Sequence, residues 1–394
     1  MTFGRSHATP AGIYIHVPFC RAKCPYCDFY SVVRPEESIV DYLTALAWEL
    51  ERSPHQGLAV DTVYFGGGTP SLLTPDQIRS ILSMVRAGFV VAADAEITLE
   101  VNPGTVDAAD LRGYRTAGVN RLNIGLQSVD DRHLDFLGRI HTAGQGIDTL
   151  GWARAVGFEN VGLDLIYALP GQGTDEWQRE LAVVADLGAE HLSCYTLTLE
   201  PGTPMAAREA SGDFVALDEE TAAALFSFTI DFLNRSGYRQ YEISNFARID
   251  GAGAIDRRSR HNRKYWTSAP YLGFGPSAHS FLDDRRWWNH RSLACYLDEL
   301  RQGRSPQAGE ETLSREQRVV ECVYLGLRQT DGIDRQDFYA RFGVDFLSLF
   351  GVAAEPLIGE GMLAASTSHI RLTPRGMLLL ESVAGRLLGA VNGE

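Results

Sequence analysis

Up to Phe246, short apolar runs alternate regularly with longer amphipathic stretches. Each apolar run is rich in β-branched or aliphatic residues and ends in glycine, proline or a polar residue, which is typical of a strand followed by a turn. Between the runs, stretches such as the one from Glu37 to Arg52 have the periodicity of helices. The predicted strands cover residues 12–18, 61–68, 96–104, 121–128, 160–171 and 191–203.

This repeated order of strand and helix favours an α/β fold with a parallel sheet. Six such units without the dinucleotide-binding pattern G-x-G-x-x-G predict a barrel or partial barrel. Two predicted helix starts support this order of strands and helices: Thr74 can cap a helix with Pro75 at its first position, and Asp107 precedes another helix. In barrels, functional side chains gather where strands end and loops begin. The unusual polar residues follow this rule at 66–69, Glu100, Gln127 and Asp164.

The pattern changes after Phe246, and we predict three parts: a partial barrel (1–246), a connecting region (247–291) and a mainly helical C-terminal domain (292–394). The connecting region is rich in glycine, arginine and aromatic residues. The C-terminal part is predicted to hold helices at 313–327, 334–342, 344–359 and 377–388, with a β-hairpin at 362–376. Helices with a small wing of strands resemble a winged-helix domain, a shape that can read DNA.

Composition narrows the function classes. The formal net charge of −14 argues against a general nucleic-acid role, because phosphate binding needs a basic surface. No apolar run approaches the roughly 20 residues that span a bilayer. The N-terminus lacks the apolar stretch of a secretory signal, so we expect a cytoplasmic protein in which disulfides are rare.

Three of the six cysteines, Cys20, Cys24 and Cys27, stand within eight residues as C-x3-C-x2-C. In a reducing compartment this predicts a metal centre. A structural zinc site would need a fourth ligand, for which His16 and Asp28 are the nearby candidates. A [4Fe-4S] cluster held by three thiolates would leave one iron open to a small molecule.

C-x3-C-x2-C with an aromatic residue, Tyr26, before the last cysteine resembles the signature of radical SAM proteins. The resemblance implies that Cys20, Cys24 and Cys27 hold a [4Fe-4S] cluster whose fourth iron binds S-adenosylmethionine (SAM), within a partial (β/α)6 barrel. By the same resemblance, the remaining SAM pocket consists of Tyr14, Tyr26, Gly67, Gly68, Thr69 and Glu100.

The segments IYIHVPFC, FGGGTPS, LEVNPG, NIGLQS, LGRIHT and LDLIYALPGQ together resemble the oxygen-independent coproporphyrinogen III oxidase family. In that family, the positions of Gln127, Arg139 and Asp164 bind a second SAM molecule. An alternative is that these three residues only tie loops to the rim of the barrel.

Two features separate this chain from the oxidase itself. The oxidase has a further cysteine two residues after the third one, where this chain has Phe29. His261 to Trp266 also fit H-N-x-x-Y-W, a motif of the heme chaperone (HemW) branch, in which the histidine is implicated in heme binding. Imidazole is a common ligand of heme iron, Tyr265 and Trp266 offer flat apolar surface, and Arg260, Arg263 and Lys264 could pair with propionates.

The resemblance therefore implies a protein that binds heme and delivers it to heme-requiring apoproteins, membrane-bound ones included, with a [4Fe-4S] cluster and SAM as cofactors. One alternative is an oxygen-independent coproporphyrinogen III dehydrogenase. Another is a zinc- or DNA-binding regulator with a winged C-terminus. For His261 itself, the alternative is a core histidine packed among aromatic rings.

Overall fold

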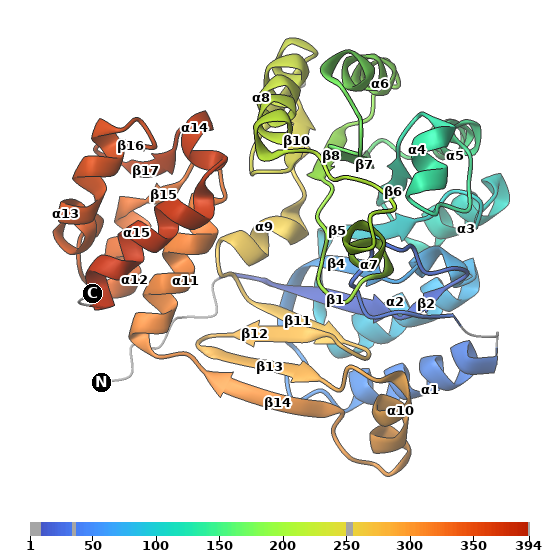
Figure 1. The fold of residues 1–394 in the computed structure, drawn as a ribbon. Helices are drawn as coiled ribbons and strands as arrows, with labels where there is room; N and C mark the ends of the chain where they lie inside the picture. Colours follow the sequence, from blue (N-terminus) through green and yellow to red (C-terminus); the bar gives the residue numbers. More distant parts are fainter. Residues whose placement is uncertain (1–8, 34–36, 250–254, 393–394) are drawn as a thin grey trace.

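The computed structural model describes residues 9–33, 37–249 and 255–392. Its centre is a curved sheet of twelve strands with helices on its outer face (Figure 1). Six strands form the barrel part and run parallel to their neighbours: β1 (Ala11–Val17), β4 (Ala59–Gly67), β5 (Val90–Val101), β6 (Arg121–Gln127), β7 (Val161–Tyr167) and β8 (His191–Thr196). The predicted partial (β/α)6 barrel is thereby confirmed, with strand starts and ends shifted by a few residues.

The outer helices alternate with these strands along the chain. They are α1 (Glu37–Glu51), α2 (Pro75–Gly88), α3 (Ala108–Ala117), α4 (Asp131–Phe136), α5 (Ala143–Ala155), α6 (Thr174–Asp186) and α8 (Glu219–Arg235), with the short α7 (Pro204–Ala210) over the open end. The predicted caps are confirmed: Thr74 forms a capping box with Gln77, and Asp107 forms one with Asp110.

The two faces of the barrel strands differ in character because side chains alternate along a strand. In β1, Ile13, Ile15 and Val17 point outward into the main hydrophobic core, beneath the helices. Tyr14 and His16 lie on the opposite face, which is the inside of the barrel. The same two-residue alternation therefore places apolar side chains in the core and polar side chains inside the barrel.

The sheet continues on both sides of the barrel. At one edge, β10 (Asn245–Arg248) pairs antiparallel with β8, and β9 (Tyr238–Gln240) pairs with β10. At the other edge, β11 (Tyr271–Phe274) runs parallel to β1 and is followed by three antiparallel strands. These are β12 (His279–Leu282), β13 (Arg285–Asn289) and β14 (Gln307–Thr312). The helices α9 (Arg260–Trp266) and α10 (Leu293–Arg301) accompany this extension.

A separate hydrophobic cluster, from Val319 to Leu387, forms the core of the C-terminal part. The last buried residue of the main cluster along the chain is Leu300. The predicted hairpin is confirmed by antiparallel pairing of β16 with β17. The predicted boundaries after residues 246 and 291 stay predictions. The elements of the C-terminal part are α11 (Arg315–Leu327), β15 (Ile333–Asp334), α12 (Arg335–Phe342), α13 (Phe346–Gly359), β16 (Leu363–Ala365), β17 (His369–Leu372), α14 (Pro374–Met377) and α15 (Leu380–Asn392).

Candidate functional site

The cysteine segment follows β1 and lies at the carboxyl ends of the barrel strands. Cys20 ends the two-residue strand β2 (Phe19–Cys20), which pairs with β3 (Val32–Val33), and the backbone N–H of Cys27 donates to the carbonyl of Cys24 (3.1 Å). All three thiols are free and half-buried. Burial raises the pKa of Cys27, and the nearby Cys24 and Cys20 raise it further. A metal that stabilises the thiolates would remove this penalty.

The spacing of the sulfur atoms separates the two metal hypotheses. Around one zinc ion, thiolates at about 2.3 Å from the metal lie about 3.8 Å from each other. Among the described residues, the three cysteine sulfurs do not form a set within 4.8 Å of one another. Of the two candidate fourth ligands, His16 and Asp28, His16 hydrogen-bonds through both ring nitrogens, to Tyr14 (3.2 Å) and to the carbonyl of Tyr30 (3.0 Å). The donor set therefore fits a wider multi-iron cluster better than it fits zinc.

The glycine turn after β4 packs directly against the cysteine segment. A Cβ atom at Gly67, whose φ is +110°, would lie 2.7 Å from the His16 ring, and one at Gly68 would lie 2.6 Å from the Phe19 carbonyl oxygen. The Gly68 N–H donates to the carbonyl of Val17 (2.8 Å). Only glycine permits this approach of two backbones. At the end of the turn, the Thr69 hydroxyl lies 3.5 Å from the Cys20 sulfur.

Glu100, near the end of β5, is half-buried inside the barrel. Burial raises its pKa to about 7; the Tyr64 hydroxyl, which donates to Oε1 (2.8 Å), lowers the pKa, whereas the nearby Asp164 raises it. A Cβ atom at Gly66 would lie 3.2 Å from the same oxygen, so the carboxyl group touches the glycine turn. When ionised, it is an acceptor for amino or hydroxyl groups of a ligand.

Arg139 joins the cysteine segment to the barrel. Its guanidinium lies 3.3 Å from both the Cys24 sulfur and the Tyr26 hydroxyl oxygen. It also donates to the Asn102 side chain (2.8 Å) and the Gly125 carbonyl (3.0 Å). A cation at this position stabilises an anion nearby, be it a thiolate, a cluster or a carboxylate.

The other two residues predicted for a second SAM also face this space. Gln127 has a φ of +66°, which is unusual for a residue with a side chain. A Cβ atom at Gly125 would be 3.0 Å from its amide nitrogen and 3.2 Å from Arg139, so the two side chains are neighbours. Asp164 accepts a hydrogen bond from Asn123 (2.6 Å); burial raises its pKa, whereas hydrogen bonds from Ser193 and Asn123 lower it.

His261 lies deeper in the barrel and is 1% exposed. Its ring stacks on Tyr64 (5.1 Å between centroids), and both ring nitrogens are engaged, Nδ1 with Thr62 (2.8 Å) and Nε2 with Tyr265 (3.0 Å). Burial lowers its pKa to about 3. This is the packing of a core histidine, and contact with heme iron would require one of these hydrogen bonds to break. The assignment of His261 to heme stays a prediction.

The rest of the H-N-x-x-Y-W motif links the barrel to the C-terminal part. The Arg328 guanidinium lies 4.6 Å above the Trp266 ring, and Gln329 donates to the Trp266 carbonyl (3.4 Å). The cations proposed for propionates have acidic neighbours: Lys264 pairs with Asp61 (2.7 Å). Arg260 contacts Asp61 and Asp94, and Arg263 lies 3.7 Å from Asp256.

Three further residues of the site had no role in the sequence analysis. Tyr64 donates a hydrogen bond to Glu100, Asn102 accepts one from Arg139, and Asn123 donates one to Asp164. Tyr64 and Asn123 stand at inward positions of β4 and β6, and Asn102 follows β5 directly. The alternation of inward and outward residues and the rule of strand ends could have identified them.

Comparison with known proteins places this arrangement in a family. Residues 14–183 match the Radical SAM superfamily, and residues 313–379 match the HemN C-terminal domain. The chain belongs to the radical SAM superfamily, in the group that carries this C-terminal domain.

Relatives span nearly the whole chain. A protein named heme chaperone HemW from Mycobacterium tuberculosis (strain H37Rv) is 36% identical over 96% of this chain and 95% of its own length. One of the same name from Bacillus subtilis is 33% identical over 95% of this chain and 98% of its own length. The solved structure of coproporphyrinogen III oxidase (HemN) from Escherichia coli superimposes with a TM-score of 0.83 and 26% identity, covering 97% of this chain and 91% of that chain.

Proposed function

We propose that this chain is a heme chaperone, which binds heme and passes it to heme-requiring proteins. The observation that carries the proposal is its full-length similarity to relatives named heme chaperone HemW, at 33–36% identity. Phe29 supports it, because it stands where the decarboxylating oxidase has a fourth cysteine. Its ring is 65% exposed beside the cysteine segment and can neither ligate a metal nor carry a proton.

The residues at the strand ends fit the cofactors that the family implies. Cys20, Cys24 and Cys27 would hold a [4Fe-4S] cluster. Tyr14, Tyr26, the turn at Gly67 to Thr69, and Glu100 would form the SAM pocket. When bound, the reduced cluster supplies an electron to the SAM sulfonium. Arg139 would hold negative charge beside Cys24, and Glu100 would accept hydrogen bonds from the ligand.

For heme, we propose contact with His261 after its ring leaves Thr62 or Tyr265. Partners would be heme-requiring apoproteins, membrane-bound ones included. No helix among the described residues is long and apolar enough to cross a membrane. The net charge of −14 speaks against nucleic acid as a partner.

A second candidate is oxygen-independent coproporphyrinogen III dehydrogenase. It is favoured by the structural match to the Escherichia coli oxidase and by Gln127, Arg139 and Asp164, which face the same space. Such an enzyme would have to remove two propionate carboxyl groups as carbon dioxide.

The deciding experiment uses anaerobically purified protein with a reconstituted cluster. One arm supplies SAM, a reductant and coproporphyrinogen III, and product is followed by mass spectrometry. The other arm titrates heme and then adds an apo-hemoprotein. A chaperone binds and transfers heme without decarboxylation. Turnover of coproporphyrinogen without heme transfer would establish the second candidate and reject the first.

A further inference from the structure

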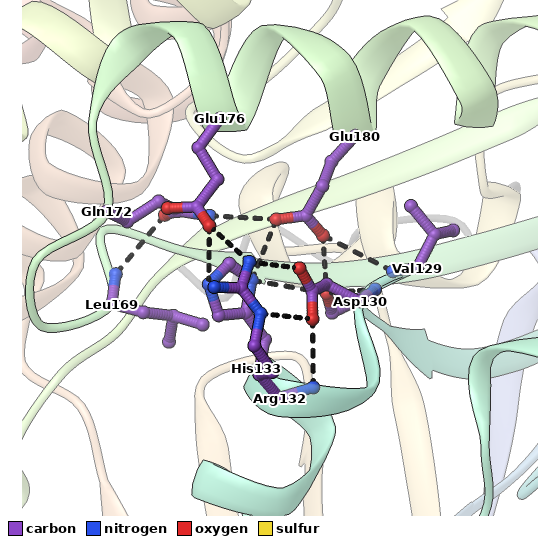
Figure 2. A network of polar contacts seen from close by, with 9 residues as sticks. Val129, Asp130, Arg132, His133, Leu169, Gln172, Glu176 and Glu180 are labelled. Atoms are coloured by element: carbon purple, nitrogen blue, oxygen red, sulfur yellow. Dashed lines mark hydrogen bonds and ion pairs between the residues drawn. The ribbon is translucent and has the colours of Figure 1, made fainter.

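Outside the barrel, a buried carboxylate contacts the two turns that follow β6 and β7, the strands that carry Gln127 and Asp164. Glu180 on α6 is 5% exposed and is surrounded by hydrogen-bond donors from three segments. One oxygen accepts from the Ser128 hydroxyl and the Val129 N–H (3.2 Å). The other lies 2.8 Å from His133 Nδ1 and accepts from the Gln172 amide (3.0 Å). Figure 2 shows Glu176 and Glu180 projecting from α6 toward α4.

Each turn begins at a residue with unusual backbone geometry. Gln127 (φ +66°) precedes Ser128, and Ala168 (φ +60°) precedes Leu169. The second turn is closed by Gln172, whose side chain accepts from the Leu169 N–H (3.3 Å) while its amide reaches Glu180. Side-chain-bearing residues keep a left-handed conformation only where their surroundings hold them there. Glu180 is hydrogen-bonded to both turns and can supply such a restraint.

The clamp also fixes the segment that leads to Arg139. Helix α4 carries His133 and ends three residues before Arg139, with Leu137 and Gly138 between them. Burial lowers the pKa of His133, but the hydrogen bond and charge of Glu180, with Glu176 and Asp130, outweigh it, so the pKa is raised overall. The contact between the His133 ring and the Glu180 carboxyl group thus joins α4 to α6, close to the segment that carries Arg139 beside Cys24.

A divalent cation is a different interpretation of the same region, because Asp130, His133 and Glu176 offer ligand atoms close together. The guanidinium of Arg132 already lies between the two carboxylates, at 2.6 Å from Asp130 and 2.7 Å from Glu176. This cation balances their charge, so the geometry favours a clamp over a metal site.

We propose that Glu180 is a positioning residue: it holds Gln127 and Arg139 at the mouth of the barrel and thereby sets the affinity of the chain for SAM. The proposal rests on the proposed SAM pocket and extends it to a residue that touches neither ligand nor cluster. Glu180 acts on the first turn through the Ser128 hydroxyl and the Val129 N–H, and on the second turn through the Gln172 side chain.

The test compares E180Q with D175N in full-length, cluster-loaded protein. The matched control is D175N, because both variants remove one negative charge from α6, and Asp175 is exposed in the first turn of that helix. S128A, which removes one hydroxyl donor, serves as a milder second variant. Iron and sulfide content, SAM affinity from the electron paramagnetic resonance spectrum of the reduced cluster, and amide hydrogen exchange are measured for each.

We expect E180Q to keep its iron and sulfide, to exchange faster at residues 127–139 and 168–172, and to bind SAM about tenfold more weakly, equivalent to about 1.4 kcal/mol. S128A should shift in the same direction, and D175N should match the parent. Unchanged exchange in E180Q, or faster exchange with unchanged SAM affinity, would overturn the proposal. If the parent cluster does not respond to SAM, the proposed SAM pocket fails, whereas the exchange arm still decides whether Glu180 holds the turns.

Discussion

Replacement of His261 by alanine tests whether its buried ring does more than fill the barrel. The change removes two hydrogen bonds, with Thr62 and Tyr265, each worth about 1 kcal/mol. It also removes stacking on Tyr64, worth about 1 kcal/mol, and leaves a small cavity. We therefore expect the free energy of unfolding to fall by about 3 kcal/mol, measured by urea denaturation. Tyr265→Phe, which removes one hydrogen bond, should cost about 1 kcal/mol.

The same variants test the heme assignment under conditions where circular dichroism shows each protein to be folded. If the imidazole binds heme iron, His261→Ala should weaken heme binding at least about tenfold, a loss of about 1.4 kcal/mol. Tyr265→Phe releases Nε2 and should bind heme as well as the parent or better. A stability loss below about 1 kcal/mol would refute the packing argument. Equal heme affinity in His261→Ala and the parent would refute the ligand assignment.

Three further predictions concern pH and the glycine turn. Because the Glu100 pKa is raised to about 7, its carboxyl group is half ionised near that pH and becomes fully ionised above it, so SAM affinity should rise as pH passes through 7. Glu100→Gln should abolish this dependence in titrations at several pH values, and a parallel pH dependence in both proteins would contradict it. Gly67→Ala should cost at least about 1–2 kcal/mol and weaken SAM binding, because φ is +110° and the Cβ would meet the His16 ring; an unchanged urea midpoint would contradict this. Because the His133 pKa is raised in the folded protein, protonation of His133 should stabilise the fold fully below the unfolded pKa of about 6.5, and this contribution should be lost as pH rises through the folded pKa. The melting temperatures of the parent and His133→Gln should therefore converge at high pH. A difference that stays constant with pH would show that the charge of His133 has no part.

The barrel strands and the C-terminal helices could be predicted because their signals are local. The two-residue alternation in β1 and the capping residues Thr74 and Asp107 determine structure within a few positions. The extension by β11 to β14 could not be predicted in this way. Those strands are short, and β11 joins the sheet by pairing with β1, more than 250 residues earlier in the chain.

The residues of the candidate site likewise fall into two groups, those that local sequence can identify and those that depend on distant contacts. The cysteines, the glycine turn and Glu100 are recognisable because each stands at a strand end with distinctive chemistry. The contact of Arg139 with Cys24 spans 115 positions, and nothing local reveals it. The burial of His261, on α9, depends on Tyr64 and Thr62 of β4, about 200 residues earlier in the chain. The role of Glu180 depends on turns that follow two different strands.

The central claim is that this radical SAM chain carries heme. It is tested most directly by titrating heme into the cluster-loaded protein under anaerobic conditions and following the absorption spectrum. The account predicts saturable binding of one heme per chain, with micromolar or tighter affinity, about −8 kcal/mol or more favourable. A spectrum that never saturates, or that matches free heme throughout the titration, would contradict it.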